Sequence, residues 1–97
     1  MDMMTSPISK KVTVINKLGL HARPAAMVAQ LALEAESNIW LIKSNRQAEA
    51  SSIIDLLTLE CPKGAELGLC AENASDLPII ERIADLFENG FMEETLQ

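Results

Sequence analysis

The chain has 97 residues, 48% of them hydrophobic, and a formal net charge of −6. This length is enough for one domain with a single core. The acidic balance excludes a nucleic-acid partner, because binding a phosphate backbone requires a basic face. The few aromatic residues, Trp40, Phe87 and Phe91, cannot form a base-stacking surface. No apolar run approaches the roughly 18 residues of a membrane span, and the first residues lack the basic and apolar regions of a secretory signal. We therefore expect a cytoplasmic protein without membrane insertion.

The two cysteines give no sign of a metal site. In a cytoplasmic chain, Cys61 and Cys70 are expected to be reduced thiols, with Cys61 in a turn before Pro62 and Cys70 packed in a strand. Neither cysteine has a histidine or a second cysteine at metal-ligand spacing. We predict no metal and no cofactor.

In chain order, residues 1–9 are expected to form a loose tail. A strand is predicted over residues 10–16, where polar and apolar residues alternate. A helix follows and runs to about Glu36, because its residues are strong helix formers. Pro24 suits the first turn of that helix, where a missing N–H costs nothing. The residues expected on its buried face are Val28, Ala29, Ala32 and Ala35.

The middle of the chain predicts a hairpin and a short helix. Residues 39–43 are rich in strand formers, residues 44–46 form a turn, and residues 47–50 form a weak returning strand. Ser51 or Ser52 can cap a helix over residues 53–59. Its apolar residues are almost continuous, so it lies either half on the core and half on a surface patch, or wholly in the core.

The last part predicts a turn over residues 60–65, a strand over residues 66–71 and a final helix. Asp76 is the expected cap of that helix, with Pro78 in its first turn. Asn89-Gly90 supplies a left-handed stop, after which Phe91 folds back, and residues 93–97 form a second tail. The order βαββαβα predicts an α+β domain with helices on one face of an antiparallel sheet and the other face toward water.

His21, the only histidine, lies between the first strand pattern and the first helix. Free N–H groups and the positive end of the helix dipole meet there and favour an anion. Arg23 adds a guanidinium that suits phosphate. A neutral imidazole is a competent nucleophile, so the spacing is compatible with a phosphoryl-carrying histidine. An ordinary histidine in a helix-capping loop is the alternative.

The residues Asn16-Lys17-Leu18-Gly19-Leu20-His21-Ala22-Arg23-Pro24-Ala25 resemble the active-site signature of HPr, the histidine-containing phosphocarrier of the phosphotransferase system. The resemblance continues through residues 52–59 and 63–66 and covers about residues 12–91. The ending Leu86-Phe87-Glu88-Asn89-Gly90-Phe91, together with residues 49–52, resembles the nitrogen-related branch, called NPr.

The resemblance implies an open-faced β-sandwich, with a four-stranded antiparallel sheet and three helices on one side, in residues 10–92. It implies a monomeric carrier rather than an enzyme. Enzyme I would phosphorylate His21, in this family at Nδ1, and the carrier would donate the group to a histidine of a IIA-type protein. Arg23 would stabilise the phosphoryl oxygens, Asn16 would lie near the ring, and the backbone N–H groups of Ala22 and Arg23 would cradle the phosphate. The residues implied for partner docking are Ala25, Met27, Ile53, Leu56 and Leu57.

Ser52 aligns with a serine that a regulatory ATP-dependent kinase phosphorylates in some HPr proteins. Asp55 stands where a small glycine is usual in those proteins, and no basic residue precedes Ser52. Ser52 is therefore either a regulatory site for a serine kinase or only a helix cap.

Two other functions compete with the carrier. A regulatory module would bind partners through the 53–59 helix, with phosphorylation tuning its affinity, which fits nitrogen-type rather than sugar-transport physiology. A small-molecule enzyme is the third hypothesis. Against it, the sequence offers no second general base beside His21 and no pocket-sized loop.

Overall fold

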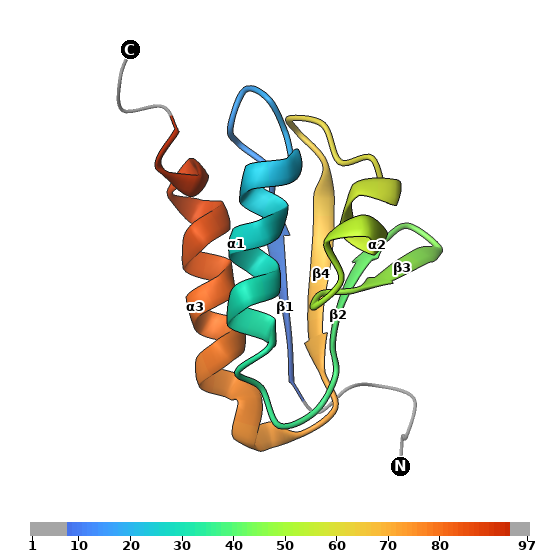
Figure 1. Cartoon of the computed structure of the whole chain (residues 1–97), viewed down its shortest axis with the longest axis vertical. Helices are drawn as coiled ribbons and strands as arrows, with labels where there is room; N and C mark the ends of the chain where they lie inside the picture. Colours follow the sequence, from blue (N-terminus) through green and yellow to red (C-terminus); the bar gives the residue numbers. More distant parts are fainter. Residues whose placement is uncertain (1–7, 94–97) are drawn as a thin grey trace.

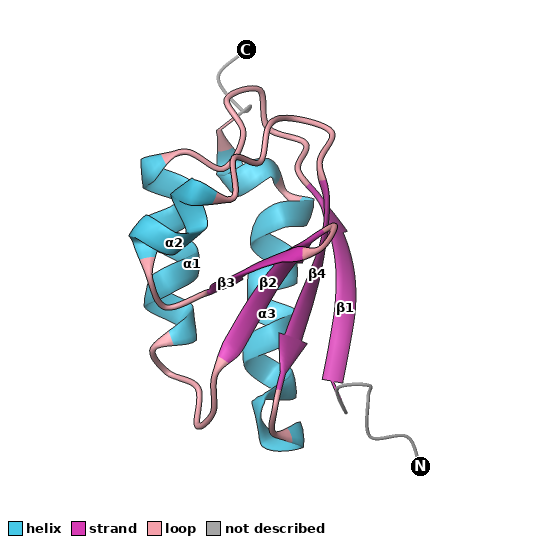
Figure 2. Cartoon of the chain, turned by 90° about the vertical axis from the view of Figure 1, so that its right-hand side faces the viewer, coloured by secondary structure: helices cyan, strands magenta, loops and turns pink. Residues whose placement is uncertain are grey.

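The computed structural model describes residues 8–93, and its strands and helices follow the predicted order. The elements are β1 (Ile8–Thr13), α1 (Ala22–Ala32), β2 (Ile39–Lys43), β3 (Arg46–Glu49), α2 (Ile53–Thr58), β4 (Glu66–Ala71), a 3₁₀ turn η1 (Ala74–Asp76), α3 (Leu77–Glu88) and a 3₁₀ turn η2 (Gly90–Met92). The four strands form one antiparallel sheet in the order β1-β4-β2-β3. The three α-helices lie on one face of it (Figure 1 and Figure 2). The predicted α+β fold is confirmed.

Alternation along the strands places the core between the sheet and the helices. In β2, Ile39 and Leu41 are buried, and in β4, Leu67 and Leu69 are buried, because every second side chain points toward the helices. Phe87 of α3 packs edge to face against Phe91, with ring centroids 5.0 Å apart. The predicted fold-back of Phe91 is therefore confirmed. Within residues 8–93, no helix has both the length and the apolar character needed to cross a membrane.

The bounds of β1 and the end of α1 differ from the prediction, and β1 ends at Thr13 rather than at Asn16. β1 begins at Ile8, so that Ile8 and Ser9, expected in the tail, pair with residues of β4. α1 ends at Ala32, about four residues before the predicted end at Glu36. Of its predicted buried face, Val28, Ala29 and Ala32 are buried and Ala35 is half-buried. Residues 1–7 and 94–97 of the two predicted tails lie outside the described residues.

Asp76 binds the segment that follows α1. It occupies the predicted N-cap position of α3, but its side chain makes no capping hydrogen bond there. Its buried carboxylate instead accepts hydrogen bonds from the Glu36 amide at 2.8 Å, the Ser37 amide at 2.9 Å and the Ser37 hydroxyl at 2.6 Å. The Ser37 hydroxyl first, and then the Glu36 amide, lower the pKa of Asp76 against the opposing effect of burial. Asp76 thus ties the segment after α1 to the start of α3.

The short helix α2 lies half in the core and half at the surface, which was one of the two predicted arrangements. Ser52 is its N-cap, and the Ser52 hydroxyl accepts a hydrogen bond from the Asp55 amide at 3.2 Å. Leu56 is fully buried, whereas Ile54 is 73% exposed. Ile53 and Leu57 are also exposed.

Two basic side chains of the β2–β3 hairpin hold the other end of α2. Lys43 Nζ donates to the carbonyls of Leu59 at 3.0 Å and Glu60 at 2.6 Å. Arg46 Nη2 donates to the Thr58 carbonyl at 2.6 Å. These are carbonyls that a helix leaves without intrahelical partners, at the negative end of its dipole. The surface that α2 presents is therefore fixed at both ends.

Candidate functional site

The loop between β1 and α1, which carries His21, is held against the loop between α2 and β4. The Leu20 amide donates to the Cys61 carbonyl at 2.9 Å, and the Val14 amide donates to the Ala65 carbonyl at 2.9 Å. Gly19 makes this approach possible. Its φ is +73°, and a Cβ at this position would lie 2.6 Å from the Cys61 carbonyl oxygen. Only glycine satisfies both the left-handed backbone and the close contact.

His21 is the N-cap residue of α1, with an extended backbone, and its side chain makes no capping hydrogen bond. The ring is 35% exposed. The amides of Ala22 and Arg23 lie in the first turn, where an α-helix offers no intrahelical acceptor. Pro24, next in the chain, has no N–H to satisfy. The amides predicted to cradle the phosphate therefore lie in the first turn of α1, at the positive end of its dipole.

Glu93, the last described residue, lies directly beside His21. Its Oε2 is 2.9 Å from His21 Nε2 and 4.0 Å from Arg23 Nη2. The Glu93 side chain is only 9% exposed, whereas that of Arg23 is 70% exposed. The prediction that no second general base stands beside His21 was wrong, because the chain returns to the site after α3 and places the Glu93 carboxylate there.

An unusual backbone turn brings Glu93 to this place. Gly90, Phe91 and Met92 all have positive φ angles, of 63°, 56° and 60°. For residues other than glycine, this left-handed conformation costs roughly 1–2 kcal/mol each. Packing of Phe91 against Phe87 helps to offset the strain. The sequence predicted the left-handed turn at Gly90, but two further left-handed residues carry no sequence signal, so Glu93 was missed.

Asn16 connects this turn to the histidine loop. It is completely buried, and its Nδ2 donates to the Gly19 carbonyl at 2.8 Å and to Glu93 Oε1 at 3.0 Å. Both acceptors face the Nδ2 end of the Asn16 amide, so they fix which way the amide points. As a result, Asn16 Oδ1 has no hydrogen-bond partner among the described residues. Asn16 was predicted near the ring, and it reaches the ring through Glu93 rather than by a direct hydrogen bond.

The contacts of Glu93 keep its carboxylate ionised. Burial alone would raise its pKa, but the hydrogen bonds from Asn16 and His21 and the nearby charges of His21 and Arg23 outweigh burial and lower the pKa. An ionised carboxylate only accepts hydrogen bonds. The proton between the two groups therefore belongs to His21 Nε2.

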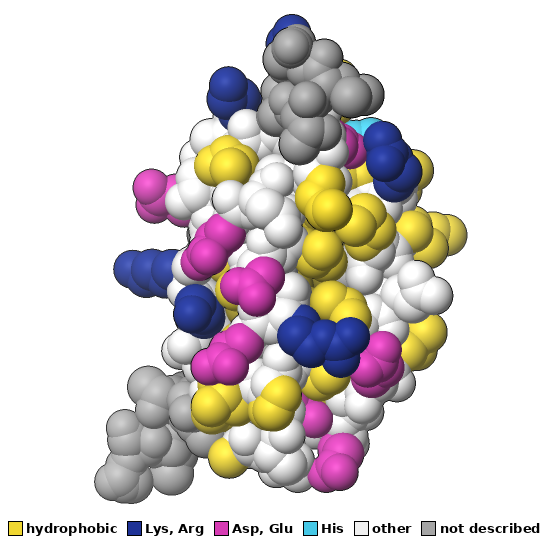
Figure 3. All heavy atoms as spheres, turned by 90° about the vertical axis from the view of Figure 1, so that its left-hand side faces the viewer, with side chains coloured by type: hydrophobic (Ala, Val, Ile, Leu, Met, Phe, Trp, Pro, Cys, Tyr) yellow, Lys and Arg dark blue, Asp and Glu magenta, His cyan; other side chains and the backbone are white. Residues whose placement is uncertain are grey.

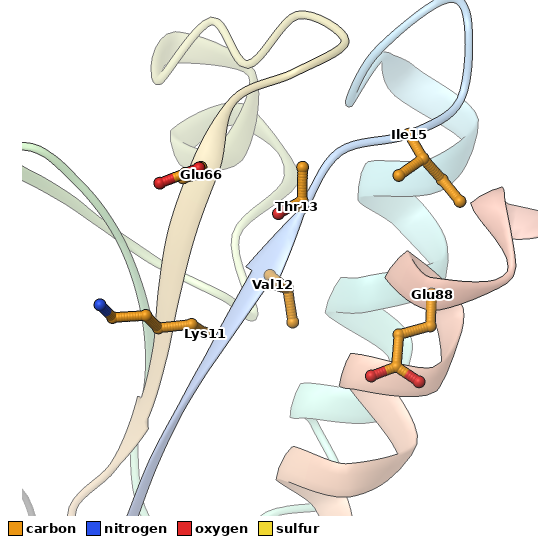
Figure 4. A pocket seen from close by; sticks show the side chains of 6 residues that line it. All are labelled: Lys11, Val12, Thr13, Ile15, Glu66 and Glu88. Atoms are coloured by element: carbon orange, nitrogen blue, oxygen red, sulfur yellow. The ribbon is translucent and has the colours of Figure 1, made fainter.

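The surface around the site is shallow. A hollow of about 460 Å³ borders the histidine and is lined by Leu18, Leu20, His21, Lys43, Glu60, Cys61 and Pro62. A second hollow, of about 420 Å³, lies between the edge of the sheet and α3 and is lined by Lys11, Val12, Thr13, Ile15, Glu66 and Glu88 (Figure 4). The two share no lining residue. No group of three or more metal-ligand side chains comes together within the described part of the chain.

Apolar side chains gather on two grooves next to α1. One groove lies between α1 and α3 and is lined by Met27, Gln30, Leu31, Glu34 and Leu86. Figure 3 shows apolar side chains along this face, with the histidine in cyan at its upper end beside basic and acidic groups. The other groove lies between α1 and α2, has a volume of about 500 Å³ and includes Leu33, Ile53 and Ile54.

Not all predicted docking residues reach the surface. Ala25 and Leu56 are 0% exposed, because both point into the core between the helices and the sheet, so the prediction that they contact a partner was wrong. Met27 is half-buried, and Ile53 and Leu57 are exposed.

A family model described as the PTS HPr component phosphorylation site matches residues 8–89. The chain belongs to the HPr family. It is 36% identical over 87 residues to the phosphocarrier protein HPr of Treponema pallidum, covering 90% of this chain and 99% of that protein. It is 34% identical over 86 residues to the phosphocarrier protein NPr of Shewanella violacea, covering 89% and 94%.

Solved HPr structures confirm the fold. The crystal structure of HPr-C-His from Thermoanaerobacter tengcongensis superimposes with a TM-score of 0.84 at 37% identity, covering 90% of this chain and 98% of that one. A structure of an HPr dimer from the same organism gives a TM-score of 0.68 at 35% identity, covering 94% and 98%. HPr-family proteins are phosphocarriers of the phosphotransferase system rather than catalysts. The family includes both HPr and NPr branches, and relatives from both resemble this chain to a similar degree.

Proposed function

We propose that His21 accepts a phosphoryl group at Nδ1 from phosphorylated Enzyme I and passes it to a histidine of a IIA-type protein. One observation carries this proposal. The only histidine stands part-exposed at the N-terminus of α1, beside the free amides of the first turn and the guanidinium of Arg23. The hollow beside it is open and shallow, which suits an exchange between protein surfaces better than enclosure of a small substrate.

The groups around His21 match the demands of a carrier. Phosphoryl transfer depends mainly on positioning and on stabilising charge. A phosphoryl group carries about 1.5 to 2 negative charges, and each charge-assisted hydrogen bond is worth about 1.5–3 kcal/mol. The amides of Ala22 and Arg23 and the exposed Arg23 side chain can supply a few such bonds. These contacts hold the group but still allow it to leave.

The test is phosphorylation with phosphoenolpyruvate and Enzyme I, followed by transfer to IIA proteins of the sugar and nitrogen types. We expect the native chain to be labelled and His21→Ala to fold normally and take up no label. Arg23→Ala should slow the transfer, whereas Arg82→Ala, which removes an exposed arginine paired with Glu34 on the surface, should not. Label that persists in His21→Ala would contradict the proposal, and preferential transfer to one IIA type identifies the branch.

A second candidate function is a regulatory module that binds partners through the groove between α1 and α2. The observation that favours it is a run of exposed apolar side chains, with Leu33 72% and Ile54 73% exposed. We expect Ile54→Glu to weaken IIA binding while His21→Ala preserves it. Leu77→Glu, at an exposed leucine of α3, is the matched control. Leu56 is unsuitable for this test, because a charge at a fully buried position would unfold the chain.

The carrier is further proposed to act in the cytoplasm as a monomer, since one chain supplies His21, Arg23, Asn16 and Glu93. Sedimentation of the native protein measures this directly, and dimers are known among its structural relatives.

Ser52 is proposed as a helix cap rather than a target of a serine kinase. The hydrogen bond from the Asp55 amide to the Ser52 hydroxyl supports that role.

A further inference from the structure

Glu93 is held in place at considerable cost to the chain. The backbone before it includes two left-handed residues other than glycine, Phe91 and Met92. The carboxylate is nearly buried, and the Asn16 side chain that orients it keeps its own Oδ1 unpaired. Strain and unsatisfied polar groups that gather around one side chain indicate a functional role for it.

The contact between Glu93 and His21 determines the state of the ring. Glu93 Oε2 lies 2.9 Å from His21 Nε2, and the carboxylate accepts while Nε2–H donates. In a neutral imidazole only one nitrogen carries a proton. Its other nitrogen, Nδ1, then holds the free electron pair, and it makes no hydrogen bond to any residue among 8–93.

We propose that Glu93 is a positioning residue for phosphoryl transfer: it keeps the proton on Nε2, so that Nδ1 is the attacking atom, and it pairs with the ring when the ring becomes positive. This inference rests on the proposed function of His21. The role resembles that of a carboxylate behind a catalytic histidine, which fixes the tautomer and stabilises the imidazolium. Here the histidine itself is the nucleophile.

The step balances without any other reactant. The electron pair of Nδ1 forms a bond to the phosphorus of the donor, and the electrons of the broken bond between that phosphorus and the donor return to the donor atom. His21 keeps its Nε2 proton, so its ring becomes an imidazolium that carries the phosphoryl group on Nδ1. The hydrogen bond to Glu93 is then an ion pair. Transfer to the acceptor reverses these changes.

Opposing charges act on this step, and their positions decide the outcome. Glu93 repels the incoming phosphoryl group, but it touches the edge of the ring that carries Nε2, whereas the phosphoryl group binds at Nδ1. The attraction to the positive ring acts at hydrogen-bond distance and is therefore the larger effect. Arg23, 4.0 Å from Glu93, is available to both anions.

The first experiment measures the tautomer without any phosphotransfer. Long-range proton–nitrogen NMR of ¹⁵N-histidine-labelled protein, recorded where the ring is neutral, reports each ring nitrogen separately. We expect Nε2 to be protonated and Nδ1 unprotonated in the native chain. In Glu93→Leu the two nitrogen shifts should move toward each other as both tautomers become populated. Unchanged shifts in Glu93→Leu, or a native chain with its proton on Nδ1, would overturn the proposal.

The second experiment measures the rate of phosphorylation by Enzyme I. We expect Glu93→Leu to lower the second-order rate constant by about 10- to 100-fold, the loss of one charge-assisted hydrogen bond, with little change in Enzyme I affinity. Glu93→Gln keeps an acceptor oxygen but no charge, and a native rate in it would show that the charge plays no part. Glu88→Leu, at an exposed glutamate of α3 that lines the other hollow rather than the one beside His21, is the matched control and should transfer normally.

The two experiments separate failure of this inference from failure of the proposed function. If the native chain is not phosphorylated at all, the proposed function fails, whatever the NMR result. If the native chain is phosphorylated on His21 and the Glu93 variants react at the native rate, only the role of Glu93 fails.

Discussion

Replacing Gly19 by alanine tests whether close contact between two loops builds the site. The new methyl group would lie 2.6 Å from the Cys61 carbonyl oxygen and 3.1 Å from the Pro62 Cα. Both are backbone atoms, so neither can turn aside as a side chain would. The loops must separate, and the 2.9 Å hydrogen bond from the Leu20 amide to the Cys61 carbonyl must weaken.

Three effects set the size of the loss. A left-handed alanine costs roughly 1–2 kcal/mol, overpacking typically costs about 1–3 kcal/mol, and the weakened hydrogen bond adds about 0.5–1.5 kcal/mol. Alanine also restricts the unfolded chain more than glycine does, and this stabilises the folded state by about 0.4–1 kcal/mol. We expect Gly19→Ala to lower the free energy of unfolding by about 2–6 kcal/mol. Small domains are stable by only about 5–15 kcal/mol, so the effect is readily measured.

The assay is urea denaturation. Unfolding is monitored by the fluorescence of Trp40, the only tryptophan, and by circular dichroism. Gly64→Ala is the matched control. Gly64 also has a positive φ, of +96°, but nothing lies within 4 Å of the Cβ it would gain, so it should lose only about 1 kcal/mol. Equal losses in the two variants would refute the argument from contact. Gly19→Ala should also slow phosphorylation, because it displaces the loop that carries His21.

Three further predictions concern Asp76, Ser52 and Cys61. The pKa of Asp76 is lowered in the fold, so its contribution to stability is present above the unfolded pKa, about 3.9, and is lost as the pH falls through the folded value. Acid titration of Asp76→Asn should therefore show a smaller loss of stability below about pH 4 than the native chain. Ser52→Ala should lower the free energy of unfolding by about 1 kcal/mol, measured by urea denaturation, because the Asp55 amide loses its acceptor. Burial raises the pKa of the Cys61 thiol despite nearby basic groups, so a thiol reagent should modify the half-buried Cys70 first, as peptide mapping will show.

Local patterns predicted the fold well, because they arise from neighbouring residues. The strands predicted over residues 39–43 and 66–71 match β2 and β4 to the residue, and the cap of α2 is Ser52, one of the two serines predicted for it. The predicted end of α1 was about four residues too late, and the Glu36 amide, expected inside the helix, bonds instead to Asp76, about 40 positions later in the sequence. The helix propensity of a segment does not indicate that a distant carboxylate will accept hydrogen bonds from the amides at its end.

The site was predictable only in its contiguous part. His21, Arg23 and Asn16 belong to one short segment, so their proximity follows from the chain itself. Glu93 reaches the ring through the left-handed backbone of Phe91 and Met92, which neither residue type favours. Burial of Ala25 and Leu56 likewise depends on which helix faces meet, and the periodicity of such short apolar segments leaves that open.

The contact between His21 and Glu93 joins positions 72 residues apart in the sequence. Bringing such distant positions together costs loop-closure entropy, which only the completed fold offsets. A molecule in which the turn at residues 90–93 is not in place therefore has the histidine but lacks the carboxylate beside it. On a ribosome or after partial unfolding, such a molecule would be a poor recipient of phosphate, so full transfer competence would be confined to chains that have completed their fold.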